Sequence, residues 1–188
     1  MITRLSMMTL MLALVACSEA ESPPVDPATE PAAPASPSST PAADSSAPCQ
    51  AAQLALALES SDAGAGNRGH TLAVTNTGNA GCTLEGWPEV RLLDAADREL
   101  DSIRAEQTLG SYFQAGEAPR PVQLESQGRA YFDLLSSAIP HGDEGECPRA
   151  AAIRVTPPGD VAAMELDLEL QPCGGRVRGT PLRPVVQP

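Results

Sequence analysis

The sequence has 188 residues, enough for one ordinary domain with appendages, and 42% of them are hydrophobic, as is normal for a globular protein. Acidic residues outnumber basic ones by 24 to 12, for a net charge of −12, and every basic residue is arginine. This charge argues against nucleic-acid binding, which needs a basic face, and against adsorption to anionic lipid head groups through charge.

The N-terminus has the pattern of an export signal. Arg4 precedes the apolar run Leu5–Ala16, which ends in the box Leu-Val-Ala-Cys at Cys17. The run is too short to span a bilayer core of about 30 Å, and the box stands where a signal peptidase would cut. The pattern resembles a bacterial lipoprotein signal peptide (1–16), in which the bond before Cys17 is cut and that cysteine is lipidated. An ordinary secretory signal and a short transmembrane helix are the alternatives.

A lipidated cysteine would anchor the chain to a membrane without a spanning helix. Ser18, directly after it, resembles the signal for sorting to the outer membrane of Gram-negative bacteria. Residues 17–48 are rich in Pro, Ala and Ser and contain no aromatic or basic residue, so they cannot bury enough apolar area to offset the entropy of ordering. We therefore expect a disordered, lipid-anchored tether that holds the folded domain away from the outer membrane, facing the periplasm or the cell surface.

Beyond the tether, short strand patterns alternate with turns rich in Gly and Pro. Leu72–Thr75 alternates like a half-buried strand, Asn76–Gly81 supplies residues that tolerate positive φ, and Cys82 begins the return. Met164–Leu170 alternates apolar residues with carboxylates, the pattern of a strand with one solvated face. Further strands are expected at Gln53–Glu59, Val90–Asp94, Arg120–Leu124, Arg129–Leu134 and Ala151–Val155.

Short strands at regular intervals predict an all-β domain at 49–188, an immunoglobulin-like antiparallel β-sandwich. The prediction rests on strand spacing alone, because Trp87 follows Cys82 much more closely than the core tryptophan of immunoglobulin domains follows its cysteine. The segment Asp94–Leu109 is a candidate for a short helix or a long loop. Aromatic residues are only 3% of the chain, so the core must be mainly aliphatic.

Once Cys17 is set aside, Cys49, Cys82, Cys147 and Cys173 are left. In an exported protein, an even number of cysteines indicates disulfides. The four can form two bridges in any of three connectivities, and the spacing alone does not choose among them. Zinc would need closely spaced ligands, so we expect no metal site at these cysteines.

Several motifs coincide in the domain. They are Asn76-Thr77-Gly78, Cys82–Pro88 with Val90, Val122–Leu124, Gly128–Ala130, Cys147, Val155–Pro158, Cys173–Gly175 and Thr180-Pro181. Together these motifs resemble a bacterial secreted family, common in lipoproteins, that is catalogued as domain of unknown function 4232. The resemblance covers roughly residues 49 to 182, and because the family has no established activity it implies no catalytic residue.

The resemblance does imply a β-sandwich in which the first two cysteines of the domain pair, Cys49 with Cys82, and the last two pair, Cys147 with Cys173. Closing loops of these lengths is worth about 3 to 4 kcal/mol each in the chain-entropy model. The sequence departs from the family's pattern at Asp94–Arg98, where family members usually have a glycine in the turn.

Few residues suggest chemistry. His70 and His141 are expected in solvated loops, and no Gly-x-Ser-x-Gly elbow accompanies them. The loop His141–Glu146 concentrates acidic residues, but their spacing does not match an EF-hand, so we expect a solvated turn, with weak binding of a divalent cation as the alternative. The carboxylates Glu165, Asp167 and Glu169 form a row, which is typical of an outer strand face and, in some sandwiches, of a glycosidase.

Exposed aromatic residues could mark a binding surface. Tyr112 or Tyr131 could expose an aromatic ring that binds a partner, whereas Trp87 and Phe132 are expected in the core. The sequence therefore predicts a non-enzymatic, lipid-anchored envelope protein, with no cofactor and no metal, whose partner is the membrane through its lipid and possibly an envelope protein or glycan. The alternatives are an envelope enzyme that acts on glycans or peptides through carboxylates, and a module that binds a divalent cation or small ligand.

Overall fold

The computed structural model describes residues 47–113 and 115–184. The expected signal peptide (1–16), the lipidation site Cys17 and all but the last two residues of the 17–48 tether lie outside the described residues. Within the part that is described, no helix has the length and hydropathy needed to cross a bilayer.

The described residues form an all-β fold with one short 3-10 helix, η1 (Ala51–Gln53). The strands, in chain order, are β1 (Leu54–Gly64), β2 (Asn67–Asn76), β3 (Cys82–Leu84), β4 (Glu89–Leu93), β5 (Arg104–Gln107), β6 (Val122–Leu124), β7 (Arg129–Ser137), β8 (Ala150–Thr156), β9 (Met164–Leu170) and β10 (Cys173–Gly179). Every strand expected from alternation is confirmed, with boundaries that differ by a few residues.

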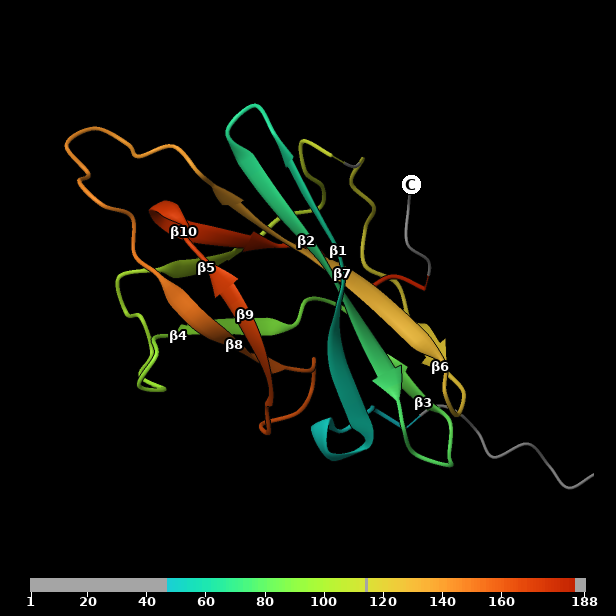
Figure 1. The fold of residues 1–188 in the computed structure, drawn as a ribbon. Coiled ribbons are helices and arrows are strands. Elements are labelled where there is room, and N and C mark those ends of the chain that lie inside the picture. The colour runs from blue at the N-terminus through green and yellow to red at the C-terminus, as the bar shows by residue number, and fades with distance from the viewer. Residues whose placement is uncertain (1–46, 114, 185–188) are drawn as a thin grey trace, which may run out of the picture. The chain divides into compact units, whose positions relative to one another are not determined.

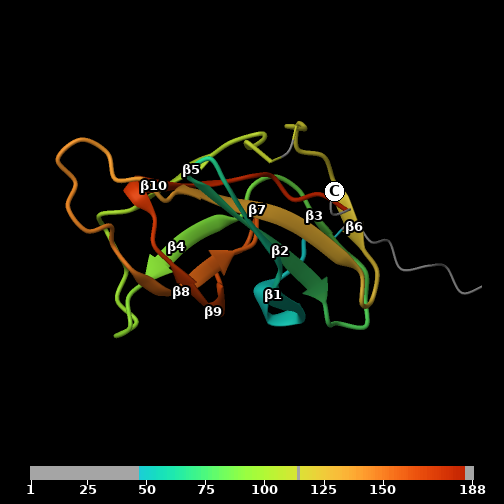
Figure 2. The ribbon, with the colours of Figure 1, turned by 45° about the horizontal axis from the view of Figure 1, so that its top comes forward.

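The strands form three sheets. A five-stranded sheet has the order β1-β2-β7-β10-β5, a three-stranded sheet has the order β4-β8-β9, and β3 pairs with β6. All pairs are antiparallel except β5 with β10, which run parallel. Figure 1 shows the arrangement of the strands, and in Figure 2 strands β5, β7 and β10 of the five-stranded sheet lie above β4, β8 and β9, so the two larger sheets lie in separate layers.

The hydrophobic core joins residues from all three sheets. It is mainly aliphatic, as the composition predicts, and it includes Phe132, which is fully buried. Each fully buried Leu, Ile or Phe contributes about 1.5 to 3 kcal/mol relative to exposure. The members of this core include Leu72 and Val74 of β2, Phe132 and Leu134 of β7, Val90 and Leu92 of β4, and Ile153 and Val155 of β8.

The face of β7 that points away from this core is also covered. Residues 180–183 continue the line of β10 beside β7, where the backbones of Tyr131 and Arg183 exchange hydrogen bonds of 2.8 and 2.9 Å. On this face the side chain of Arg183 reaches that of Asp133: Arg183 Nη2 lies 2.8 Å from Asp133 Oδ1, and the two side chains are only 10% and 6% exposed. A buried ion pair therefore fastens the end of the described chain to the sheet.

Two strands were not expected from the sequence. In β5 all four residues, Arg104–Gln107, are exposed, so the strand has no apolar alternation to detect. In β10 the consecutive glycines Gly174 and Gly175 both have positive φ, which interrupts the pattern that would have indicated a strand. The segment Asp94–Leu109, a candidate for a helix or a loop, contains a turn followed by β5 and no helix.

The turn that departs from the family's pattern forms without the expected glycine. Asp97 has a φ of 58°, a left-handed conformation that Asp tolerates better than most residues. The carboxylate of Asp94 stabilises the turn, since its Oδ1 accepts hydrogen bonds from the backbone N–H groups of Ala96 (2.8 Å) and Arg98 (3.1 Å). The departure is therefore accommodated locally.

Candidate functional site

A cleft of about 770 Å³ opens between the five-stranded and three-stranded sheets, at the end that carries Cys147 and Cys173. The beginning of β2 and the residues around the end of β7 line one side, and the beginning of β8 and the end of β9 line the other. Its charged residues are Arg68, Glu146, Arg149 and Glu169, with His70 beside them. A concave site of mixed polarity on a rigid sheet scaffold is the kind of place where proteins bind ligands.

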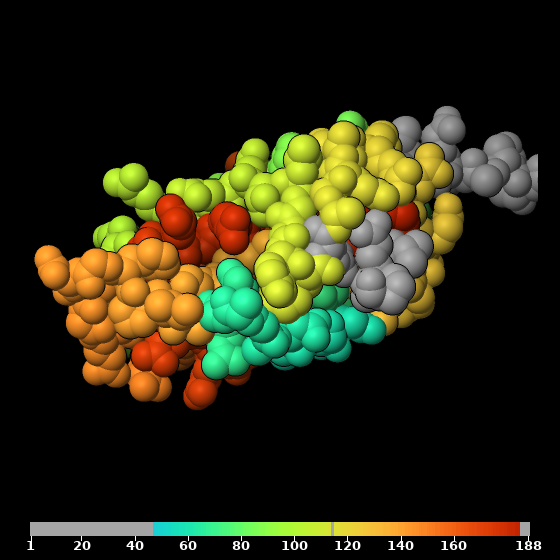
Figure 3. Space-filling model, turned by 90° about the horizontal axis from the view of Figure 1, so that it is seen from above, coloured from blue at the N-terminus to red at the C-terminus, as the bar shows by residue number. Residues whose placement is uncertain are grey.

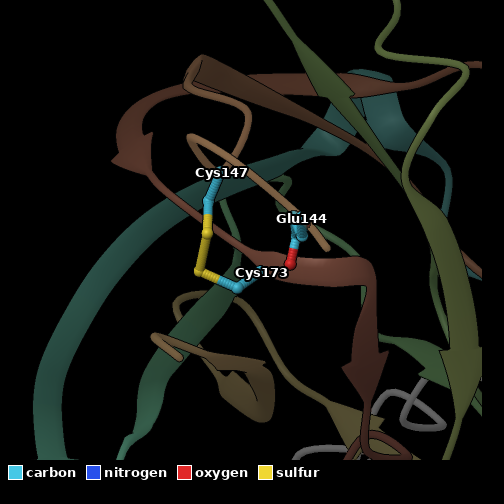
Figure 4. A group of neighbouring side chains, drawn as sticks. All are labelled: Glu144, Cys147 and Cys173. Atoms are coloured by element: carbon cyan, nitrogen blue, oxygen red, sulfur yellow. A yellow bond between two sulfur atoms is a disulfide. The ribbon is translucent and has the colours of Figure 1, made fainter. Parts of the chain in front are cut away.

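At the edge of this cleft, ligand atoms of Glu144, Cys147 and Cys173 lie within 4.8 Å of one another (Figure 4). The two cysteines form a disulfide with a Cα–Cα distance of 4.9 Å, so neither sulfur is the thiolate that a metal would need. The Glu144 carboxylate instead accepts hydrogen bonds from the backbone N–H groups of Gly174 (2.8 Å) and His141 (3.0 Å). Glu144 and the disulfide together form a clasp that closes the 141–147 loop onto the start of β10.

The clasp predicts a pH effect. The hydrogen bonds from the His141 and Gly174 backbones hold the pKa of the Glu144 carboxyl below its usual range. Such a group stabilises the fold fully above its unfolded pKa of about 4.3 and loses this contribution as the pH falls through the lower folded pKa. Glu144→Gln should therefore lower the Tm at pH 7, and the gap to the unchanged chain should close on acidification below about pH 4.3.

Thermal unfolding followed by circular dichroism between neutral and acidic pH measures this gap. Glu146→Gln is the matched control, because the Glu146 carboxylate is in the same loop but forms only an exposed ion pair with Arg149. A gap for Glu144→Gln that stays constant down to acidic pH would contradict the role assigned to the carboxylate.

His70 lies within β2 and is half-buried, contrary to the expectation of a solvated loop. Its Nδ1 atom is 2.8 Å from Oγ of Ser61, the residue opposite it on β1. Burial, and then the nearby Arg68 guanidinium, lower the pKa of His70, so the ring is neutral at pH 7. A neutral imidazole beside a hydroxyl is one half of a nucleophile–base arrangement, but in residues 47–113 and 115–184 no carboxylate orients the other ring nitrogen.

Comparison with models of protein families assigns this sandwich-like domain to a family. The model described as Domain of unknown function (DUF4232) matches residues 49–183, which is most of the chain. The chain belongs to this family. A search of curated proteins found no match. The two disulfides of this DUF4232 domain, Cys49–Cys82 and Cys147–Cys173, are those that the resemblance implies.

Other motif residues of the DUF4232 domain serve its scaffold. Asn76 is fully buried, and its side-chain amide donates hydrogen bonds to the backbone oxygens of Ala80 (2.9 Å), Leu124 (3.1 Å) and Glu125 (3.2 Å). At Gly128 a Cβ atom would lie 2.9 Å from the backbone oxygen of Glu125, so a larger residue would displace the turn before β7. The motifs therefore close turns and join strands.

The carboxylate row of the DUF4232 domain is the solvated face of β9, as its alternation predicts. Glu165, Asp167 and Glu169 are exposed, whereas Met164, Leu168 and Leu170 are buried. Glu165 also forms an ion pair of 2.7 Å with Arg154. The row thus presents carboxylates on an open strand surface, and only its last member, Glu169, borders the cleft.

The aromatic residues divide as expected with one exception. Tyr112 is 68% exposed and stacks edge-to-face with Phe113 at a centroid distance of 5.4 Å. Phe132 is buried in the core, but Trp87 is only half-buried. The Trp87 indole N–H donates a hydrogen bond of 3.1 Å to the backbone oxygen of Thr108, which explains why the ring stays at the edge of the core.

Proposed function

We propose that this DUF4232 domain is a non-enzymatic interaction module of the bacterial cell envelope. In this proposal its fold is an immunoglobulin-like sandwich, anchored by a lipid on Cys17 to the outer membrane and carried on the 17–48 tether. The partner is an envelope protein or glycan that enters the cleft beside the Cys147–Cys173 disulfide. The net charge of −12 and the exposed carboxylates of β9 support a role in solvent rather than on an anionic lipid surface.

The observation that carries the proposal is that two carboxylates at the cleft, those of Glu144 and Glu146, are already engaged in hydrogen bonds or an ion pair. Glu144 is held by the Gly174 and His141 backbones, and Glu146 lies against Arg149. The hydrogen bonds to Glu144 fix the loop at the wall, whereas the exposed pair of Glu146 and Arg149 adds little rigidity, and the two carboxylates are not paired with each other as a general acid and base would be. A preorganised cleft of this kind is suited to recognition.

Site-specific crosslinking in intact cells tests the cleft. A photoreactive amino acid is placed at Ala138, which lines the cleft, or at Val161, which is 99% exposed in the turn at the opposite end of the β8–β9 hairpin. We expect a discrete adduct from position 138 that is absent from position 161, identified by mass spectrometry. Equal, diffuse labelling at both positions would contradict the proposal.

The anchor has its own test. Cys17→Ser should abolish incorporation of an alkyne-labelled fatty acid and release the chain from the membrane fraction, since a single residue would carry the acyl chains. Ser18→Ala, which leaves the lipidated residue in place, is the control and should keep the label. A Cys17→Ser chain that still carried the label and sedimented with membranes would contradict anchoring at this residue.

The contact between Ser61 and His70 favours one alternative, a hydrolase with Ser61 as nucleophile. A fluorophosphonate probe distinguishes the two functions, because it labels an activated serine and leaves an ordinary hydroxyl unmodified. The interaction module predicts no label. Labelling that disappears in both Ser61→Ala and His70→Gln would replace the interaction module with the enzyme.

A further inference from the structure

The arginines of the described residues fall into two groups. Most are ion-paired with a carboxylate, but Arg68, Arg104, Arg176 and Arg178 have no such partner among residues 47–113 and 115–184. In a chain with 24 acidic residues and 12 basic ones, carboxylates are abundant, so unpaired arginines need an explanation. The paired ones are Arg91, Arg98, Arg120, Arg129, Arg149, Arg154 and Arg183.

The register of β5 and β10 brings three of the unpaired arginines together. Arg104 lies directly opposite Arg176, and Glu106 lies opposite Arg178. Alternate residues of a strand share a face, so these four side chains project from the same side, while Val177 between the two β10 arginines is buried on the other. Like charges opposite each other on neighbouring strands are destabilising, and Glu106 offsets only one of the three.

A hollow of about 350 Å³ lies beside these arginines, on the outer face of the five-stranded sheet. In Figure 3, which looks onto this face, β10 (red) is exposed between the loop after β7 (orange) and the segment that contains β5 (yellow-green). Most of the polar groups that line the hollow can donate hydrogen bonds, and Glu106 is the acidic residue at its rim. The lining residues are Asn67, Glu106, Leu135, Ser136, Ser137, His141, Arg176 and Arg178.

The clasp described above places His141 at this hollow. Gly174 has a φ of +75°, and a Cβ atom there would lie 2.6 Å from Nδ1 of His141, so the imidazole can pack over β10 only because the residue is glycine. Glu144 holds the same loop by its hydrogen bonds to the backbones of Gly174 and His141. Two features of the loop thus position a further donor next to Arg176 and Arg178.

We propose that this hollow, lined by His141, Arg176 and Arg178, is a binding site for the phosphoryl group of a small soluble ligand. Guanidinium groups bind phosphate oxygens through paired N–H donors, and two of them on one strand face can grip one anion from two directions. Lipid head groups carry the same chemistry, but a chain of net charge −12 is repelled by an anionic bilayer. The hollow shares only Ser136 with the lining of the cleft, and the proposal does not depend on the function proposed for the cleft.

Calorimetric titration of the full-length chain with inorganic phosphate, and then with glycerol 3-phosphate, tests the site. We expect saturable binding with a Kd of about 1 mM or tighter, weakened about tenfold or more by Arg178→Gln because a charge-assisted hydrogen bond is lost. The matched control is Arg91→Gln, which removes the same charge from an exposed ion pair with Glu89 outside the hollow and should leave the affinity unchanged.

The Tm of Arg178→Gln without ligand should change little, because no ion pair joins Arg178 to the facing Glu106 and the change also relieves repulsion from Arg176, and this separates loss of binding from loss of folding. No saturable binding of either phosphate compound, or equal weakening by Arg91→Gln, would overturn the proposal. A Cys17→Ser chain, which has no lipid of its own, is also sedimented with vesicles that contain phosphatidylglycerol. Vesicle binding in the absence of phosphate binding would overturn the assignment to a small soluble ligand.

Discussion

Asp133→Ala is expected to lower the free energy of unfolding by about 3 to 5 kcal/mol, because it leaves the Arg183 guanidinium buried without its counter-charge. Asp133 Oδ1 accepts hydrogen bonds of 2.8 Å from Arg183 Nη2 and from Thr71 Oγ1, and Asp133 is only 4% exposed. The change would also loosen residues 180–183, which the pair holds against β7. Urea unfolding of the full-length chain, followed by circular dichroism, measures the loss.

The ion pair of Asp133 and Arg183 leaves some of its polar atoms without hydrogen bonds, and this leads to a second expectation. Asp133 Oδ2 and Arg183 Nε are buried and have no hydrogen-bond partner within the described residues, and a cavity of about 20 Å³ borders both residues. That volume is close to the minimum for one water molecule. Replacing both partners with apolar residues, as in Asp133→Leu with Arg183→Met, should therefore cost much less than Asp133→Ala alone.

An exposed ion pair provides the control for this comparison. Arg91 and Glu89 lie 2.6 Å apart, but more than half of each side chain is accessible to solvent. Arg91→Ala should change the free energy of unfolding by less than about 1 kcal/mol, because an exposed pair gains little over solvated charges. If Asp133→Ala cost no more than Arg91→Ala, the buried pair would have no special role in fastening the end of the domain.

The strands that could be predicted are those whose burial alternates along the sequence. The pattern Met164–Leu170 specified both the existence of β9 and the face that meets solvent, because its carboxylates are exposed and the apolar residues between them are buried or half-buried. Leu72 and Val74 likewise marked β2, although that strand proved to be buried on both faces, since Thr71 and Ala73 are covered as well. Alternation along the sequence therefore predicts a strand and its buried face best where the other face of the strand is exposed to solvent.

The strands β5 and β10 could not be predicted, because each depends on pairing with a segment that is distant in the sequence. The exposed run Arg104–Gln107 becomes a strand only by pairing in parallel with residues 176–179, which lie far along the chain. The same distance hid the arginine cluster, since Arg104 and Arg176 are neighbours only in the sheet. The contact between Ser61 and His70 depends on a register that shifts between Leu58 and Ser60, and no sequence pattern records that irregularity.

The disulfide pairing was available from the family resemblance but not from the spacing of the cysteines. Each bridge joins strands or strand ends that the fold brings together, Cys49 to the start of β3 and Cys147 to the start of β10. Sequence separations of 33 and 26 residues are equally compatible with other pairings. The structure agrees with the resemblance, and it adds that only Cys49–Cys82 packs within the main core cluster, whereas Cys147–Cys173 borders the cleft.

That distinction predicts unequal effects of removing the two bridges. Replacing Cys49 and Cys82 together by alanine should lower the free energy of unfolding by about 3 to 4 kcal/mol through loop entropy alone, for a separation of 33 residues. Loss of two buried sulfur atoms adds a cavity term, because Cys49 and Cys82 are 1% and 2% exposed in the core. Cys147 and Cys173 are also buried, at 6% and 2%, but they border the cleft and lie outside the core cluster, so their double replacement should leave a smaller new cavity and cost less.

The N-terminal bridge also holds the entry of the chain into the domain. The Cys49 N–H donates to the Thr83 oxygen (3.0 Å), and the Thr83 N–H donates to the Ala47 oxygen (2.8 Å), so the segment before η1 pairs with β3 beside the disulfide. Urea unfolding under oxidising conditions compares the two double variants with the unchanged chain, and unfolding of the unchanged chain in reductant controls for loss of both bridges. A larger loss at Cys147 and Cys173 would show that the clasp at the cleft stabilises the domain more than the sulfur atoms in its core.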